Sequence, residues 1–164
     1  MTEVISVKKA VACSKELKYL NKKIVLAGGC FDILHPGHKV FLQKAKQSGD
    51  SLIILLESDE KVKILKGVNR PIHNQDSRAQ ALAALGIIEY IVMLPVMKND
   101  QEYDQLILGI KPDVIATTSK DKNLSHHKRA ANLTGAKLKE VTQVVGNYST
   151  SSLVESLNVQ YQDR

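Results

Sequence analysis

Residues 28–38 read GGCFDILHPGH and lie between a short apolar run, residues 24–27, and a segment with helical spacing. Glycine lacks a Cβ, so Gly28 and Gly29 let the chain turn sharply and pass close to a ligand. Pro36 suits the first turn of a helix, whose N–H groups have no intrahelical partner. These groups and the positive end of the helix dipole favour phosphate. The stretch therefore predicts a strand, a tight turn and a helix whose N-terminus binds an anion.

The remainder of the chain alternates short apolar runs with longer segments of helical periodicity. This alternation is typical of a parallel sheet whose faces are covered by helices. Strands are predicted at residues 24–27, 52–56, 90–94, 114–116 and 137–141. Helices are predicted at residues 8–20, from Pro36 to before Gly49, from a cap at Asp76 to before Gly86, from Tyr103 to before Pro112, and at residues 125–133 and 152–157. We therefore predict an α/β fold, a Rossmann-like three-layer sandwich with a five-stranded parallel sheet and helices on both faces.

Length and cysteine content limit the class of protein. The chain has 164 residues, which is room for one domain. We predict a single domain over residues 1–164, with an N-terminal helical extension over residues 1–22. Cys13 and Cys30 are too few for a disulfide framework, so a reducing cytoplasm is the expected location.

Composition also limits the partners. The N-terminus lacks the pattern of a signal peptide, and no apolar run reaches the roughly 18 residues of a spanning helix, so no membrane partner is expected. The formal net charge is +6, but the lysines are scattered and aromatic residues make up only 4%, so nucleic-acid binding is not expected. A pocket for small anionic substrates accounts for the charge as well.

His35 and His38 are three residues apart, so both rings can face one bound group on the first helical turn. A surface or capping role for this pair is the alternative interpretation. Zinc would need a third ligand, and His73, His126 and His127 have no suitable spacing. No metal ligands are therefore predicted in the chain.

Residues 28–38 contain neither the G-x-G-x-x-G of a dinucleotide fold nor the G-K-[ST] of a P-loop. Residues 29–38 resemble instead the G-x-F-D-x-x-H-x-G-H signature of the nucleotidylyltransferase superfamily, and every specified position matches. Residues 58–72, 110–115 and 148–151 are similar to the adenylyltransferase domain of ADP-heptose synthases. The resemblance spans about residues 10 to 157, and glycerol-3-phosphate cytidylyltransferases share much of it.

The resemblance implies a reaction. A nucleoside monophosphate would pass from a nucleoside triphosphate to a small phosphorylated acceptor, with release of pyrophosphate, and ATP and a sugar 1-phosphate are favoured. The alternatives are a CTP-dependent cytidylyltransferase of the glycerol-3-phosphate type and a non-catalytic nucleotide-binding homologue. Mg²⁺ is expected to be carried with the triphosphate and to take few protein ligands. A homodimer is expected because relatives are commonly dimers.

The resemblance also implies roles for individual residues. The catalytic candidates are His35, His38, Lys66 and Arg78. The nucleotide-binding candidates are Gly29, Cys30, Phe31, His35, Gly37, His38, Ser149, Thr150 and Ser151. The acceptor-binding candidates are Asp32, Lys63 and Arg70. Both lysines are expected on a loop-like stretch, and Arg78 early in a helix, where a lone arginine needs a partner. Turn capping is the alternative role for Asp32, and helix capping for the three hydroxyl residues.

Three features depart from the heptose branch. Ala27-Gly28 stands where those enzymes usually have Thr-Asn, and Thr117 to Asp121 stands where they have Gly-Gly-Asp. The nucleobase and the acceptor are therefore left open. The heptose enzymes are often fused to a sugar kinase, for which we expect no room in 164 residues.

Overall fold

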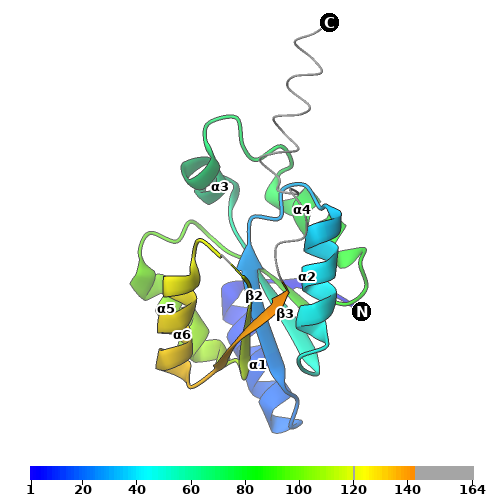
Figure 1. Cartoon of the computed structure of the whole chain (residues 1–164), viewed down its shortest axis with the longest axis vertical. Coiled ribbons are helices and arrows are strands. Elements are labelled where there is room, and N and C mark those ends of the chain that lie inside the picture. The colour runs from blue at the N-terminus through cyan, green and yellow to red at the C-terminus, as the bar shows by residue number, and fades with distance from the viewer. Residues whose placement is uncertain (120, 143–164) are drawn as a thin grey trace, which may run out of the picture.

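A six-stranded sheet forms the centre of the structure, a computed structural model described over residues 1–119 and 121–142 (Figure 1). Its strands are β1 (Glu3–Ile5), β2 (Ile24–Gly29), β3 (Ser51–Leu56), β4 (Tyr90–Met93), β5 (Val114–Thr118) and β6 (Lys137–Thr142). They lie in the order β1-β4-β3-β2-β5-β6, and every neighbouring pair is parallel. The predicted parallel sheet is thus confirmed, with one strand more than the five expected.

The additional strand, β1, lies at the edge of the sheet. Its residues Glu3–Ile5 pair with Tyr90–Val92 of β4. Three residues are too few to show a periodic pattern, so the sequence indicated only a helical extension over residues 1–22. In the structure, this segment supplies the edge strand as well as helix α1 (Val7–Tyr19).

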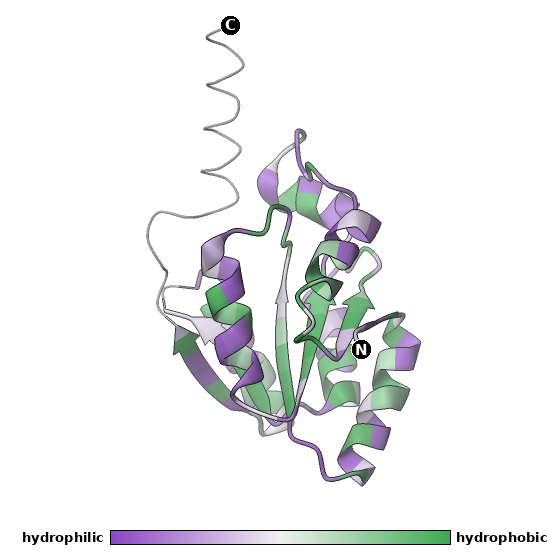
Figure 2. Cartoon of the chain, turned by 90° about the vertical axis from the view of Figure 1, so that its right-hand side faces the viewer, coloured by the Kyte–Doolittle hydropathy of each residue, from purple (hydrophilic) through white to green (hydrophobic). Residues whose placement is uncertain are grey.

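Helices cover both faces of the sheet. Besides α1 they are α2 (Pro36–Lys46), α3 (Asp59–Lys66), α4 (Gln75–Ala83), α5 (Asp100–Ile110) and α6 (Leu124–Thr134). On one face, α2 and α4 bury Leu42, Ala45, Ala79 and Leu82. On the other face, α1 and α5 bury Ala10, Leu17, Leu106 and Ile110, and α6 packs beside α5. Figure 2 shows the apolar strands between helices with hydrophilic outer sides, which confirms the three layers.

Two predictions about the segment after β3 are wrong. Residues expected in a loop form α3, because Ser58 caps it by accepting the N–H of Lys61 at 3.1 Å, and acidic residues follow in its first turn. Helix α4 is capped by Asn74, which accepts the N–H of Ser77 at 2.8 Å, and Asp76 lies inside its first turn. Asn and Asp cap helices about equally well, so spacing alone did not separate them. The helix predicted at residues 152–157 lies outside the described residues.

The order of the strands locates the ligand-binding edge. From the central strand β2, the chain proceeds through β3 and β4 on one side and through β5 and β6 on the other. At such a switch point the connections diverge at the carboxyl edge and leave space for a ligand. The turn at residues 28–38 follows β2 and lies at this point. Among the described helices, none is both long and apolar enough to cross a membrane.

Candidate functional site

The turn after β2 presents two histidines at the start of α2. His35 is the N-cap, since its Nδ1 accepts the N–H of His38 at 3.3 Å, and Pro36 occupies the first turn. Because Nδ1 is the acceptor, the proton of the neutral His35 ring lies at Nε2. The two rings stack, with centroids 3.7 Å apart and planes inclined by 18°. His35 therefore caps the helix and also lies against His38, so the two interpretations of this pair are compatible.

Phe31 fixes the position of His38. Its φ is 44°, a conformation that residues other than glycine rarely adopt, and its buried ring lies 5.3 Å from the His38 imidazole. A Cβ on Gly29 would come within 3.0 Å of the Phe31 ring. Gly29 and Phe31, both predicted to bind nucleotide, therefore shape the turn that holds His38.

His38 is neutral at physiological pH. Burial and the nearby His35 and Lys66 lower the pKa of His38 to about 4, although a hydrogen bond to the Ile33 backbone opposes this shift. Its Nδ1 is buried and has no hydrogen-bond partner among the described residues. Buried polar atoms without a partner are rare in folded proteins. This atom therefore marks a place where a ligand can bind.

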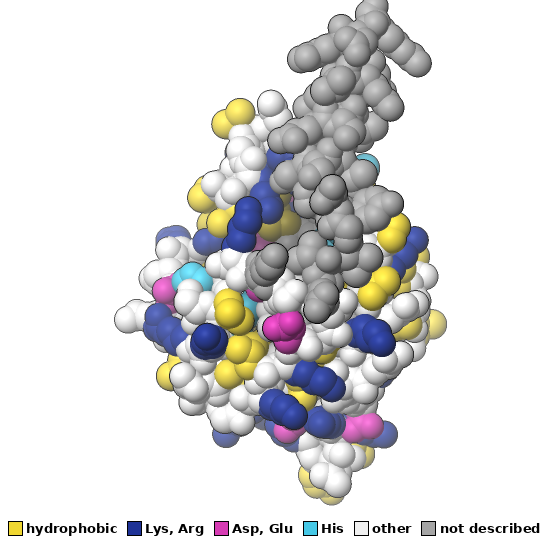
Figure 3. All heavy atoms as spheres, viewed as in Figure 1, with side chains coloured by type: hydrophobic (Ala, Val, Ile, Leu, Met, Phe, Trp, Pro, Cys, Tyr) yellow, Lys and Arg dark blue, Asp and Glu magenta, His cyan; other side chains and the backbone are white. Residues whose placement is uncertain are grey.

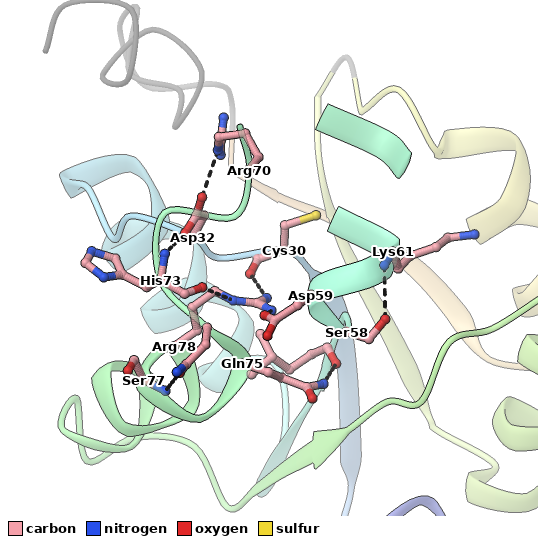
Figure 4. A network of polar contacts seen from close by, with 12 residues as sticks. Cys30, Asp32, Ser58, Asp59, Lys61, Arg70, His73, Gln75, Ser77 and Arg78 are labelled. Atoms are coloured by element: carbon pink, nitrogen blue, oxygen red, sulfur yellow. Dashed lines mark hydrogen bonds and ion pairs between the residues drawn. The ribbon is translucent and has the colours of Figure 1, made fainter. Parts of the chain in front are cut away.

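Asp32 and Arg70 form a buried ion pair beside the turn (Figure 4). Arg70 Nε donates to Asp32 Oδ2 at 2.8 Å, and the backbone N–H groups of Ile72 and His73 donate to the same carboxylate at 2.7 and 2.9 Å. Burial alone would raise the pKa of Asp32, but these three hydrogen bonds hold it below its ordinary value. Nη2 of Arg70 is buried and has no partner among the described residues. Asp32 thus orients a cation whose Nη2 keeps its donors for a ligand.

Arg78 lies on the inner side of the same turn, and all its nitrogens donate to protein atoms (Figure 4). Nε donates to the His73 carbonyl at 3.0 Å, Nη1 to the Cys30 carbonyl at 2.7 Å, and Nη2 to Asp59 at 2.8 Å. Arg78 is only 1% exposed. The partner expected for this arginine is therefore the protein itself, and Arg78 joins the turn, α3 and the start of α4.

The two candidate lysines lie on α3 rather than in a loop. Lys66 is the nearer to the turn, because its charge acts on both His38 and Cys30. Burial raises the pKa of the Cys30 thiol, and the positive charge of Lys66 opposes that shift. A neutral thiol is a poor nucleophile, so Cys30 serves as a small residue of the turn. Figure 3 shows basic and apolar side chains together over α3, where Lys63 and Lys66 are exposed.

The segment that departs from the heptose branch forms a compact hydrogen-bond network after β5. Thr117 Oγ1 donates to Asp121 at 2.8 Å, the Asn123 N–H donates to it at 2.8 Å, and His127 Nε2 lies 3.2 Å from it. Burial would raise the pKa of Asp121, but these contacts lower it to about 2. His127 therefore helps to hold this segment. Ala27, the other departure, is a core residue at 3% exposure.

Sequence reasoning missed a pair at the same edge, Glu57 and Tyr103. Glu57 directly follows β3, and its carboxylate accepts the hydroxyl of Tyr103 at 2.8 Å. The available signal was its position, since the residue after a buried parallel strand lies at the ligand-binding edge. Tyr103 was predicted only as part of a helix. Ser149, Thr150 and Ser151, the remaining nucleotide-binding candidates, lie outside the described residues.

Comparisons with known proteins agree with this geometry. Residues 26–95 match the family model described as Cytidylyltransferase-like. The bifunctional protein HldE from a Nitratiruptor species is 40% identical over 144 residues, which is 88% of this chain and 29% of that protein. The chain thus spans 29% to 30% of the length of the curated relatives that it first matches.

Two solved structures have the same fold. The lipopolysaccharide core biosynthesis protein from Thermoplasma volcanium GSS1 has a TM-score of 0.59 and 22% identity, and the match covers 78% of this chain and 99% of that chain. Pantoate-beta-alanine ligase from Francisella tularensis has a TM-score of 0.64 and 15% identity, over 99% of this chain and 78% of that chain. The signature at residues 29–38 lies within residues 26–95, so this part of the chain is similar to the Cytidylyltransferase-like family.

Proposed function

We propose that the protein transfers a nucleoside monophosphate from a nucleoside triphosphate, preferably ATP, to a small phosphorylated acceptor such as a sugar 1-phosphate. An oxygen of the acceptor phosphate attacks the α-phosphorus, the bond between the α-phosphorus and the bridging oxygen breaks, and pyrophosphate leaves. Such a reaction asks the protein mainly to position the reactants and to stabilise negative charge.

The observation that carries this proposal is a pair of buried nitrogens without partners beside one helix N-terminus. They are Nδ1 of His38 and Nη2 of Arg70, and both belong to residues around the turn after β2. The N–H groups at the start of α2 add further donors. Phosphate oxygens accept hydrogen bonds from Arg70 Nη2 and from the helix N–H groups. His38 Nδ1 adds a donor when the negative charge of a bound phosphate favours the protonated ring.

In this proposal the candidate residues divide between the two substrates. The phosphates of the triphosphate contact His35 and His38, with Lys66 compensating their charge. The acceptor phosphate contacts Arg70, which Asp32 orients, and Lys63. Arg78 acts by positioning the turn. Gly29, Cys30, Phe31 and Gly37 shape the space for the nucleotide, and Ser149, Thr150 and Ser151 hold its outer phosphates.

The residues of the site are consistent with a Mg²⁺ ion that is bound by the triphosphate rather than by the protein. Among the described residues, no group of three or more His, Cys, Asp or Glu could hold a metal ion. Asp32 is already occupied by three N–H donors from the protein. Mg²⁺ would therefore be carried by the triphosphate, where it neutralises phosphate charge, as is usual for this ion.

The test is pyrophosphate release with a panel of nucleoside triphosphates and acceptor phosphates. We expect His38→Ala to lower turnover about 100- to 1,000-fold, as the loss of one preorganised donor does in other enzymes. His126→Ala is the matched control, because His126 lies on the exposed side of α6. Wild-type turnover in His38→Ala would overturn the assignment of the site.

Thermal melting in the presence of each triphosphate identifies the preferred one, because a ligand that binds only the folded state raises the melting temperature. We expect ATP to give a larger shift than CTP. The reverse order, with pyrophosphate released from CTP when glycerol 3-phosphate is the acceptor, would identify a cytidylyltransferase. A melting shift without pyrophosphate release in the presence of any acceptor would identify a non-catalytic homologue. The homodimer and the cytoplasmic location stay predictions, which sedimentation and fractionation can check.

A further inference from the structure

Glu57 occupies a position at the candidate site that the roles above leave without a function. It is the first residue after β3, and its N–H donates to the Gly29 carbonyl at 3.1 Å. Glu57 therefore lies at the carboxyl edge of the sheet, directly beside the start of the signature turn. Its side chain is half-buried, so it is neither a core residue nor a freely solvated one.

The Glu57 carboxylate is held in place by a hydrogen bond from a tyrosine on helix α5. Tyr103, on α5, places its hydroxyl 2.8 Å from Oε1 and 3.1 Å from Oε2. One hydroxyl has a single hydrogen to donate, whereas a carboxylate can accept about four. No ion pair to Glu57 forms among the described residues, and the adjacent Lys61 donates to the Met97 carbonyl at 3.4 Å. Most of the accepting capacity of this carboxylate is therefore available to a ligand.

The charges around Cys30 show that Glu57 belongs to the same site as the phosphate-binding cations. The negative charge of Glu57 and the positive charges of Lys66, Arg78 and Arg70 all act on the Cys30 thiol. The Glu57 carboxylate and these cations therefore all lie near the same residue of the turn. A phosphorylated acceptor has the matching polarity, because it carries an anionic phosphate at one end and neutral hydroxyl groups at the other.

We propose that Glu57, oriented by Tyr103, accepts hydrogen bonds from hydroxyl groups on the carbon skeleton of the acceptor and so selects polyhydroxylated acceptors over short ones. This inference rests on the proposed function and assigns to it two specificity-determining residues. Glu57 contacts the acceptor directly, whereas Tyr103 acts through Glu57 as a positioning residue. A site with a hydrogen-bonding group for a substrate hydroxyl discriminates strongly against substrates that lack it, because that group is otherwise left buried and unpaired.

A purely structural role predicts different behaviour. In that case the Glu57–Tyr103 hydrogen bond only ties β3 to α5, and its removal lowers the melting temperature without changing the preference among acceptors. The two roles are therefore distinguished by two Michaelis constants. A specificity role changes the KM for the acceptor and not the KM for the triphosphate, whereas a structural role does not change the acceptor preference. Stability is measured in parallel on the same variants.

The experiment compares wild type, Glu57→Gln and Tyr103→Phe in pyrophosphate release, with hexose 1-phosphates and glycerol 3-phosphate as acceptors. We expect Glu57→Gln to raise the KM for the hexose 1-phosphate about 10- to 100-fold, the usual effect of losing a hydrogen bond to a charged group, and to leave the KM for the triphosphate unchanged. Tyr103→Phe should shift the same KM in the same direction by less. The KM for glycerol 3-phosphate, which has only two hydroxyl groups, should rise by less than the KM for the hexose 1-phosphate in both variants.

Glu60→Gln is the matched control, because Glu60 is an exposed residue in the first turn of α3. If the wild type is active and Glu57→Gln leaves every acceptor KM unchanged, this inference is wrong and the proposed function stands. If the wild type releases no pyrophosphate with any acceptor, the proposed function fails and the inference fails with it.

Discussion

Arg70 and Arg78 are both buried arginines beside the signature turn, at 6% and 1% exposure, yet they are used differently. Every nitrogen of Arg78 donates to a protein atom. Arg70 donates through Nε to Asp32, and its Nη2 has no partner among the described residues. Two residues of the same type and burial therefore leave different numbers of donors for a ligand.

The difference separates stability from function. Burying a cation is unfavourable unless protein groups replace its water. For Arg78 the protein supplies all the replacements, so this residue is expected to hold the fold of the site together. For Arg70, the protein supplies no hydrogen-bond acceptor to Nη2 among the described residues, and an anionic ligand can supply one. Burial of an arginine is thus a weak indicator of function, whereas a buried donor without a partner is a strong one.

The largest expected effect is on stability, in Arg78→Met. The variant leaves Asp59, which is 45% exposed, and the carbonyls of Cys30 and His73 without their donor. Losing three hydrogen bonds from one buried cation costs about 3–5 kcal/mol. For a chain of this size, the melting temperature should fall by about 6–20 °C. Thermal unfolding followed by circular dichroism measures it.

Arg129→Met is the control for that prediction. Arg129 is 48% exposed and pairs with Asp100 and Asp104 on the surface. Exposed ion pairs contribute only about 0–1 kcal/mol, so this variant should melt close to the wild type. Equal melting temperatures for Arg78→Met and Arg129→Met would contradict the structural role of Arg78.

The contrast between the two arginines marks the limit of what the sequence could predict. Residues 28–38 could be predicted as strand, turn and helix because each carries a local signal, such as the glycines and Pro36. Arg70 and Arg78 could be placed near the turn only by resemblance. Which of them keeps a donor for a ligand depends on their partners, and those contacts join residues far apart in the chain.

Three further features could not be predicted, for related physical reasons. The edge strand β1 is too short to show periodicity, and it forms because β4 offers it a partner. Helix α3 was expected as a loop because its outward side is apolar as well as basic, with Ile64, Leu65 and Lys66 all exposed. Glu57 is acidic in a site expected to be basic, and its role emerges only when Tyr103 is placed beside it.

A smaller effect, on activity rather than stability, is expected for Arg70→Lys. Lysine keeps a positive charge near Asp32 but lacks the second donor arm of the guanidinium. Losing one hydrogen bond to a phosphate should lower kcat/KM for the acceptor about 10- to 100-fold. Steady-state pyrophosphate release measures this, and the melting temperature should fall by much less than in Arg78→Met. A large loss of stability with unchanged kcat/KM would reverse the roles of the two arginines.

The smallest expected effect is on the pH dependence of stability, and it concerns the Asp32–Arg70 pair. Hydrogen bonds from His73, Ile72 and Arg70 hold the pKa of Asp32 below its ordinary value in the folded state. A carboxyl group with a lowered folded pKa stabilises the fold above its unfolded pKa, and this contribution is lost as pH falls through the folded value. The wild type should therefore lose stability between about pH 5 and pH 2, and Asp32→Asn should lose less over that range.

Urea unfolding at pH 7 and pH 3 measures this loss. Arg70→Met should also reduce it, because the pKa of Asp32 then rises toward its ordinary value. Arg78→Met should leave it intact, because the hydrogen bonds of Arg78 go to His73, Cys30 and Asp59 and not to Asp32. Asp121, whose pKa is lowered to about 2, adds acid sensitivity of its own in every variant, so only differences from the wild type report on Asp32. An equal acid-induced loss in Asp32→Asn and the wild type would show that this buried pair is not ionised as the geometry requires.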